Sequence, residues 1–348
     1  MKILVNTPDL VLPGGVANHY KGLKFYWTED VVYNYFGGRR GISGRVIVIY
    51  DLLKFFLICG FGNYNFVILN PSLGKTALLR DLYFLKIAKI FKKKVIIFFH
   101  GWDTNMASEI ENNSFGFTSS FNKADGFFVL ANKFKSDLKL WGITKPVILT
   151  STKVDNSLLE NFDINNKVYS RNLLFLARIE EAKGIFIALK MYKIIKDKFP
   201  DATLTIAGKG SKITEAKKYV DEQGIRSVTF KNYIFGSQLI KVLQESSIYI
   251  LPTYHHEGMP TSVLEAMAFG LPIITRPVGG MVDFFENEKM GRMIDSLDPA
   301  DFVKPVEELF NNESKVRQIG HFNHNFAVKH FLASEVAKKI EKRIKEEF

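Results

Sequence analysis

Short apolar segments alternate with helical patterns along most of the chain, which is typical of parallel α/β layers. The alternation is interrupted by a polar stretch, Ser151–Lys167, and begins again at Asn172. Because 348 residues are too many for one ordinary core, we interpret the polar stretch as a linker between two domains. The sequence therefore predicts two Rossmann-like, doubly wound domains that face a central cleft. They span 1–155 and 156–330, and we expect a C-terminal helix over 331–348 to pack back on the first domain.

The pattern assigns most of the elements by residue range. In the first half, strands are predicted at Ile3–Asn6, Val31–Tyr35, Phe66–Leu69, Val95–Phe99, Gly126–Leu130 and Val147–Leu149, and helices at Val16–Tyr26, Ser43–Ile58, Thr76–Phe91, Ser114–Lys123 and Asn132–Leu140. In the second half, strands are predicted at Asn172–Ala177, Thr203–Ala207, Val228–Phe230, Ile248–Leu251 and Pro272–Thr275, with helices between them, and a charged helix at Ala333–Glu347.

Composition places the chain among globular proteins, with 47% hydrophobic and 24% charged residues. The single cysteine, Cys59, rules out a disulfide framework and suits a reducing compartment. The first residues do not resemble a signal peptide. The most apolar stretch, Val46–Phe61, is too short and too charged to span a bilayer, so we expect it to be a core-facing helix. These features predict a cytoplasmic protein.

Positive charge is concentrated in the first half of the chain. Residues 1–155 carry 20 Lys and Arg against 11 Asp and Glu, whereas residues 156–348 carry 27 against 25. This asymmetry favours a basic face for an anionic partner, either nucleic acid or a lipid leaflet, or else a lysine-rich solvated surface. No nucleic-acid-reading motif accompanies it.

One segment carries the most information about chemistry. It follows the predicted strand Ile248–Leu251 and reads HHEGMPTSVLEAMAFGLP over residues 255–272. Pro260 disfavours helix at Met259, so a helix begins at Thr261 and ends by Gly270. The unpaired N–H groups at such a start can bind an anion, and Glu257 and Glu265 bracket it. A helix cap with two solvated glutamates is the alternative interpretation of the spacing alone.

With its flanking segments, this motif resembles the retaining glycosyltransferases of family 4, which have the GT-B fold. The resemblance covers most of the second half, through NLLFLARIEEAKGI, LTIAGKG, VTFKNYI and IYILPTYHHEGMPTSVLEAMAFGLPIITRPVGG. It implies that Glu257 faces the donor sugar and Glu265 holds the ribose hydroxyls. It also implies that backbone amides at Thr261 and Ser262 bind the diphosphate, and Gly258 and Met259 in the preceding turn are further donor-binding candidates.

Two cations follow the first strand of the second half, Arg178 and Lys183. Spacing alone favours ordinary surface charges, but the resemblance implies that both clamp the diphosphate as negative charge grows on it. The base is expected to contact the region around Tyr233. No set of residues has the spacing of metal ligands, so we expect no metal and no cofactor.

The first half offers further candidates. Gly14 and Gly15 lie between a strand and a helix, where the family has a donor-contacting glycine loop. His19 and Tyr20 follow on that helix, where core packing is expected. His100 follows the strand Val95–Phe99, and the resemblance implies that it reaches the donor sugar.

Two residues beside His100 are less determined by the sequence. Asp103 is a further candidate for the same site. Trp102 could form part of an acceptor surface, because sugars stack on aromatic faces, or it could fill the core.

The combined prediction is a retaining, metal-independent glycosyltransferase. It would move a hexose or N-acetylhexosamine from a nucleotide diphosphate sugar, expected to be UDP-linked, to a glycan or lipid-linked acceptor in cell-envelope polysaccharide synthesis. The basic helix Thr76–Lys94 favours contact with an anionic membrane, on the inner face of the plasma membrane. An epimerase or a phosphorylase on the same fold is the alternative, and a nucleic-acid-binding module is a distant third.

Overall fold

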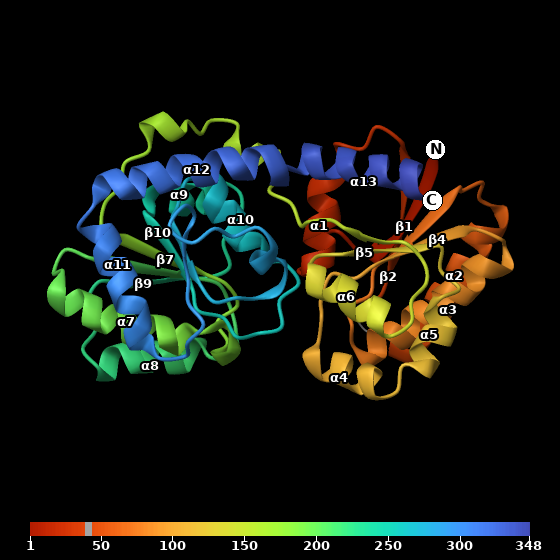
Figure 1. The fold of residues 1–348 in the computed structure, drawn as a ribbon, viewed down its shortest axis with the longest axis horizontal. Helices are drawn as coiled ribbons and strands as arrows, with labels where there is room; N and C mark the ends of the chain where they lie inside the picture. The colour runs from red at the N-terminus through yellow and green to blue at the C-terminus, as the bar shows by residue number, and fades with distance from the viewer. Residues whose placement is uncertain (39–43) are drawn as a thin grey trace. The chain divides into compact units, whose positions relative to one another are not determined.

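The computed structural model in Figure 1 describes residues 1–38 and 44–348. These residues form two compact units. The first contains Met1–Lys153, His256–Met259 and Ala333–Phe348, and the second contains Val154–His255 and Pro260–Leu332. The division at Lys153 lies close to the predicted boundary after residue 155. The sequence did not predict that the short segment His256–Met259 groups with the first unit.

The first unit is built on a six-stranded sheet with the order β2-β1-β3-β4-β5-β6, and all of its strand pairs are parallel. Its strands are β1 (Lys2–Pro8), β2 (Asp30–Phe36), β3 (Phe66–Leu69), β4 (Lys94–Phe98), β5 (Gly126–Val129) and β6 (Val147–Leu149). Its helices are α1 (Gly15–Leu23), α2 (Gly44–Phe61), α3 (Lys75–Ile90), α4 (Thr104–Asn112), α5 (Phe115–Phe121), α6 (Asn132–Leu140) and α13 (Ala333–Glu347).

The second unit has its own six-stranded parallel sheet, in the order β12-β11-β10-β7-β8-β9. Its strands are β7 (Asn172–Leu176), β8 (Thr203–Ala207), β9 (Val228–Lys231), β10 (Ile248–Leu251), β11 (Ile273–Thr275) and β12 (Gly291–Met293). Its helices are α7 (Ile185–Lys198), α8 (Ile213–Glu222), α9 (Ser237–Glu245), α10 (Thr261–Ala268), α11 (Val303–Phe310) and α12 (Glu313–Phe331). Two parallel sheets with flanking helices confirm the predicted fold class.

The helix α13 belongs to the first unit, although it lies at the far end of the sequence. The carboxylate of Glu341 on α13 accepts hydrogen bonds from the backbone N–H groups of Thr28 and Glu29, each at 2.8 Å. Lys345, one turn later, forms an ion pair with the Glu29 side chain. These bonds tie the helix to the segment that leads into β2.

The polar stretch Ser151–Lys167, interpreted as a linker, contains the division between the two units at Lys153. It is packed: Val154 is fully buried and pairs with Leu332, and two 3₁₀ turns, Asn156–Leu159 and Ile164–Asn166, follow it. The segment buries isolated apolar residues between polar ones that bond to the nearby backbone.

The stretch Val46–Phe61 was predicted to be a core-facing helix, and only one side of α2 fits that description. Ile47, Phe55 and Cys59 are buried, whereas Leu53 is 62% exposed and Phe61 is 89% exposed. The predicted first residue of this helix, Ser43, lies outside the described residues. Apolar composition gave no information about which side faces the core, because α2 is apolar all round.

Candidate active site

The strand order of the second sheet locates a binding site before any side chain is considered. Strands β8 and β9 follow β7 on one side, and β10 lies on the other side of β7. The strand order therefore reverses direction between β7 and β10. Open parallel sheets bind ligands outside the carboxyl ends of the strands at such a switch point. Arg178 and Lys183 follow β7, and Thr261 lies in the connection that follows β10.

The loop carrying Lys183 is fixed to the segment that follows β10. The carbonyl oxygen of Ala182 accepts hydrogen bonds from the Thr253 hydroxyl at 3.1 Å and from the backbone N–H groups of Tyr254 and His255, both at 2.9 Å. Gly184 makes this approach possible, because it has a φ of 81° and a side chain there would meet Pro252 O at 2.2 Å. The two connections at the switch point therefore form one hydrogen-bonded structure.

The helix α10 begins at Thr261, as predicted, after Pro260 in an extended conformation. No side chain caps its N-terminus. The hydroxyl oxygen of Tyr249 lies 2.9 Å from Leu176 O and 2.7 Å from Ser262 Oγ. Since the tyrosine has one proton, which it donates to Leu176 O, the Ser262 hydroxyl donates to Tyr249. The first backbone N–H groups of the helix remain available to an anion.

The charged candidates of the second unit differ in their surroundings. Lys183 and Glu265 are buried, at 7% and 8% exposed, whereas the Arg178 side chain is 57% exposed. Arg178 donates to Glu180 Oε1 at 2.9 Å and lies 3.3 Å from His255 Nε2. Lys183 is thus buried in the loop that follows β7, whereas Arg178 in the same loop is open to solvent.

The turn Gly208–Gly210, which resembles part of a dinucleotide-binding motif, packs against the loop that carries Arg178. A side chain at Gly208 would lie 1.9 Å from Ala177 O, and one at Gly210 would lie 2.2 Å from Ile179 O. The backbone N–H of Ile179 donates to Lys209 O at 3.0 Å. These glycines allow two loops to touch, which is a structural role.

Tyr233 is the predicted donor-binding residue that lies apart from the others in this unit. It follows β9, the edge strand, which is separated from β7 by β8. Its ring is 59% exposed and packs near Phe235.

In the first unit the switch point lies between β1 and β3, and a chain of buried amides crosses it. Asn34 Nδ2 donates to Asn6 Oδ1 at 2.7 Å, and Asn70 Nδ2 donates to Asn6 O at 2.9 Å. Asn70 Oδ1 then accepts from the Tyr20 hydroxyl at 2.7 Å and lies 3.0 Å from His100 Nε2. The backbone bond of Asn70 Nδ2 fixes the orientation of its amide, so His100 Nε2 must carry the proton.

Sequence reasoning missed Asn6, Asn34 and Asn70. A usable signal was present for Asn70, which directly follows the fully apolar strand Phe66–Leu69 at the edge where ligands bind.

Burial keeps His19 and His100 neutral. The pKa of His100 is lowered from 6.5 to about 3 by loss of water around its ring. The pKa of His19 is lowered well below its ordinary value, first by burial and then by the nearby His100. His19 and Tyr20 are core residues, as expected, with their rings packed edge-on against each other.

The segment His256–Met259 reaches the backbone of His100. A side chain at Gly258 would meet His100 O at 2.3 Å, so only glycine allows this approach. The Thr152 hydroxyl donates to Met259 O at 3.2 Å, and the Thr104 hydroxyl lies 3.1 Å from the His256 ring. Glu257 is carried in this segment, one residue from the His100 contact.

The remaining candidates of the first unit fall into distinct roles. Gly14 and Gly15 precede and begin α1, and a side chain at either would meet no atom within 4 Å. Asp103 caps α4, because its carboxylate accepts from the N–H groups of Asn105 and Met106 at 2.9 and 3.1 Å. Trp102 is 3% exposed and stacks on Phe134, so it fills the core.

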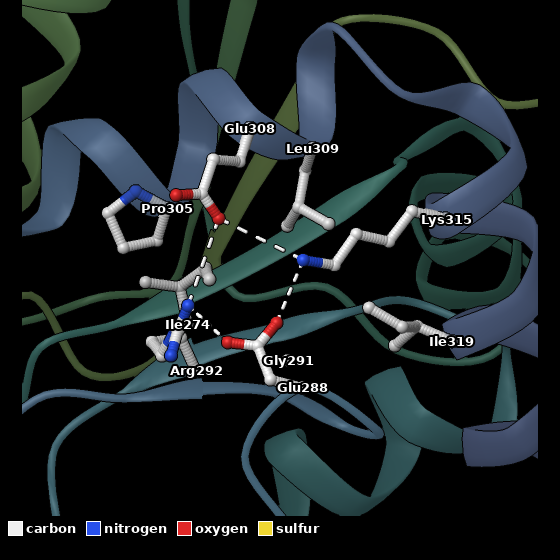
Figure 2. Close-up of a pocket in the computed structure, with 9 residues that line it drawn as sticks. All are labelled: Ile274, Glu288, Gly291, Arg292, Pro305, Glu308, Leu309, Lys315 and Ile319. Carbon is white, nitrogen blue, oxygen red and sulfur yellow. Dashed lines mark hydrogen bonds and ion pairs between the residues drawn. The ribbon is translucent and has the colours of Figure 1, made fainter.

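Figure 2 shows a small pocket elsewhere in the second unit, lined by none of the predicted site residues. Lys315 Nζ lies 2.8 Å from Glu288 and 3.8 Å from Glu308, and Arg292 pairs with the same two carboxylates. These four charges neutralise one another, so the pocket is a closed ion-pair network.

Within the described ranges 1–38 and 44–348, no group of three or more His, Cys, Asp or Glu side chains could hold a metal ion. No helix in the same ranges has the length and apolar character needed to cross a membrane.

Comparison with known proteins adds independent findings. Residues 159–326 match the family model of glycosyl transferases group 1. An uncharacterized glycosyltransferase of Haemophilus influenzae is 30% identical over 148 residues, which are 42% of this chain and 41% of that protein. The capsular polysaccharide biosynthesis glycosyltransferase CapM of Staphylococcus aureus is 26% identical over 198 residues, which are 55% of this chain and 50% of that protein.

The matched stretches thus span half or less of these curated relatives. Among solved structures, HepE of Anabaena in complex with UDP and glucose superposes with a TM-score of 0.76 over 99% of this chain and 100% of that chain. At 14% identity this similarity shows a shared fold.

Proposed function

We propose that the chain transfers a sugar from a nucleotide diphosphate donor to an acceptor, a proposal supported by the match of residues 159–326 to the family model of glycosyl transferases group 1. One observation carries the proposal. Arg178, Lys183 and the uncapped start of α10 are grouped at the switch point of the second sheet. Two cations and a helix N-terminus are what a diphosphate requires.

We assign the donor as UDP linked to a hexose or an N-acetylhexosamine. This assignment is supported by HepE, whose structure holds UDP and glucose. The proposed acceptor is a glycan or a lipid-linked glycan of cell-envelope polysaccharide synthesis, by analogy with the capsular role in the name of CapM. The proposed place of action is the cytoplasmic side of the plasma membrane.

In the second unit each proposed role follows from the chemistry of the side chain. The backbone N–H groups of Thr261 and Ser262 bind the diphosphate, and Glu265 accepts hydrogen bonds from the ribose hydroxyls. Lys183 and Arg178 stabilise the negative charge that grows on the departing diphosphate. Tyr233, whose ring is exposed after the edge strand β9, is proposed to contact the base.

In the first unit His100 and Glu257 contact the donor sugar, with Gly258 and Met259 positioning the loop. His100 is neutral and carries its proton on Nε2, where Asn70 accepts it. Its Nδ1 atom is therefore an acceptor, suited to a sugar hydroxyl. Gly14 and Gly15 leave room for the donor next to their backbone.

We propose that the reaction retains the anomeric configuration. The bond between the anomeric carbon and the diphosphate breaks while the acceptor oxygen bonds to the same face of that carbon. The proton of the acceptor hydroxyl passes to the departing diphosphate, so the step needs no oxidant. We propose that Arg178 and Lys183 stabilise the leaving charge in place of a metal ion. Full activity in the presence of EDTA is the expected result, and rescue of a chelated sample by Mg²⁺ would contradict metal independence.

The function is tested by incubating the chain with a panel of nucleotide diphosphate sugars and candidate glycan acceptors, with products identified by mass spectrometry. We expect transfer from a UDP-sugar, with a loss of at least about 10²-fold for Lys183→Ala. Lys190→Ala, an exposed lysine on α7, is the matched control and should transfer normally. Near-normal turnover by Lys183→Ala would overturn the proposal.

The same assay separates the alternatives. An epimerase would convert the donor sugar without any acceptor, and a phosphorylase would require inorganic phosphate. Binding of RNA or DNA that weakens steeply with salt, without sugar transfer, would favour a nucleic-acid-binding module.

A further inference from the structure

Helix α2 presents an apolar stripe to solvent. Its inward side repeats every four residues, through Ile47, Asp51, Phe55 and Cys59, all of which are buried. The opposite side follows helical spacing and is formed by Val46 (56% exposed), Ile49 (60%), Tyr50 (53%), Leu53 (62%), Phe56 (42%), Leu57 (55%) and Phe61 (89%). A helix that is apolar all round belongs between two apolar environments.

The neighbouring helix α3 extends this surface. Figure 1 shows α2 and α3 side by side, and the two helices are in contact. On α3, Leu79, Tyr83 and Ile90 are exposed by 55%, 46% and 66%. We call the exposed apolar residues of the two helices the α2–α3 face. Soluble monomers rarely expose a contiguous apolar surface of this extent without a partner.

The exposed charges that residues 44–94 themselves carry have one sign, although Asp125 of a neighbouring segment pairs with Lys89 on α3. Residues 44–94 contain nine Lys and Arg but only two acidic residues, Asp51 and Asp81. Both acids are buried, at 4% and 0% exposed. Asp51 accepts a hydrogen bond from the Gly37 N–H at 2.7 Å, and Asp81 pairs with Arg80. The charged groups of this segment that remain exposed are therefore cationic, and they include Lys75, Lys86 and Lys92.

We propose that the α2–α3 face docks on an anionic lipid bilayer, with the apolar stripe of α2 lying in the interface and the lysines on the headgroups. An apolar side rimmed by lysines is the pattern of an interfacial helix. Since no described helix can span a membrane, we propose that the α2–α3 face binds the bilayer at its surface. A second copy of the chain would bring like charges together across a two-fold interface, which opposes self-association.

This docking surface differs from the one expected from the sequence, which relied on the basic helix Thr76–Lys94 alone. The structure assigns the apolar anchoring to α2 and the charge to α3 and the lysines after it. The proposal concerns binding to lipid and holds whether or not the chain transfers a sugar.

The test is co-sedimentation of the full chain with vesicles of phosphatidylcholine alone and of phosphatidylcholine with phosphatidylglycerol. We expect binding to the anionic vesicles that weakens as salt is raised. The double variant Leu53→Ser/Leu57→Ser should bind roughly tenfold more weakly, because exposed leucines can be replaced without opening the core. The triple variant Lys75→Glu/Lys86→Glu/Lys92→Glu should lose the preference for anionic vesicles.

The matched control is Leu140→Ser/Val168→Ser, which removes two exposed apolar side chains away from α2 and α3, 71% and 75% exposed. It should bind vesicles like the unmodified chain. Light scattering gives the oligomeric state of each variant. Absence of vesicle binding, or a dimer that Leu53→Ser/Leu57→Ser converts to a monomer without any vesicle binding, would overturn the proposal.

Discussion

The Nε2 atom of His100 lies 3.0 Å from the Oδ1 atom of Asn70, which also accepts the Tyr20 hydroxyl proton at 2.7 Å. Two donors converge on one amide oxygen whose orientation is fixed by a bond from Asn70 Nδ2 to Asn6 O. This arrangement holds the His100 ring in one tautomer and one orientation. Asn70 is thus a positioning residue for a side chain that we propose contacts the donor sugar.

Replacing Asn70 by Ala should free the His100 ring and lower the transfer rate by about 10-fold or more, since misplaced groups lose catalytic effect. Nitrogen-15 NMR of the histidine ring should show a mixture of tautomers. Asn70→Asp keeps an acceptor oxygen and should retain the Nε2–H tautomer, while its negative charge raises the pKa of His100. An unchanged tautomer in Asn70→Ala would show that Asn70 does not position the ring.

The histidines also predict how stability depends on pH. His100 has a pKa of about 3 in the folded chain, against 6.5 when exposed. Below pH 6.5 the unfolded chain therefore takes up a proton that the folded chain does not, and the free energy of unfolding falls as pH drops toward 3. Above pH 6.5 both states are neutral and this contribution is constant.

The variant His100→Asn removes one such group. Urea unfolding at about pH 7.5 and about pH 5 should show a smaller loss of stability in the variant, by about 2 kcal/mol. An equal loss in both proteins would mean that His100 takes up its proton in the folded chain.

Gly258→Ala tests the contact that brings the Glu257 segment to His100. The added methyl group would lie 2.3 Å from His100 O, so the segment must move away, and we expect transfer to fall with little change in stability. Gly116→Ala, where nothing lies within 4 Å, is the control and should behave normally. Normal transfer by Gly258→Ala would show that the approach of the two segments is not required.

Gly184→Ala tests the loop that presents Lys183. The substitution combines a left-handed φ of 81° with a clash at 2.2 Å against Pro252 O. Gly224→Ala has a similar φ of 59° in open space, so it measures the backbone strain alone, about 1 kcal/mol. We expect urea unfolding to give a clearly larger loss for Gly184→Ala. Equal losses would show that the loop accommodates the methyl group by shifting.

The sequence predicted the parallel sheets well because fully apolar segments such as Phe66–Leu69 have few alternatives. It missed β12, whose three residues GRM carry no apolar run, and α4, whose sequence TNMASEIEN is largely polar. The polar cap Asp103 was the available signal for α4. Long-range contacts such as that of Gly258 with His100 leave no local trace, because a glycine needed for close approach looks like any turn glycine.

The candidate site shows the same division between local motifs, which could be predicted, and long-range contacts, which could not. Lys183 and the start of α10 were predicted as site residues from a family-like motif, and the strand order places the connections that carry them at one switch point. The outward side of α2 was assigned to the core because apolar composition carries no direction. Asn70 was overlooked because an asparagine after a strand is ordinary until its partners are known.

The central claim is that a diphosphate binds at the switch point whose two connections carry Lys183 and the N-terminus of α10. Calorimetric titration with UDP tests it most directly. Unmodified chain and Lys190→Ala should bind UDP with equal affinity, which falls as salt is raised. Lys183→Ala should bind at least about tenfold more weakly, as expected when one charge-assisted contact to phosphate is lost. Equal affinity in all three proteins would contradict the account.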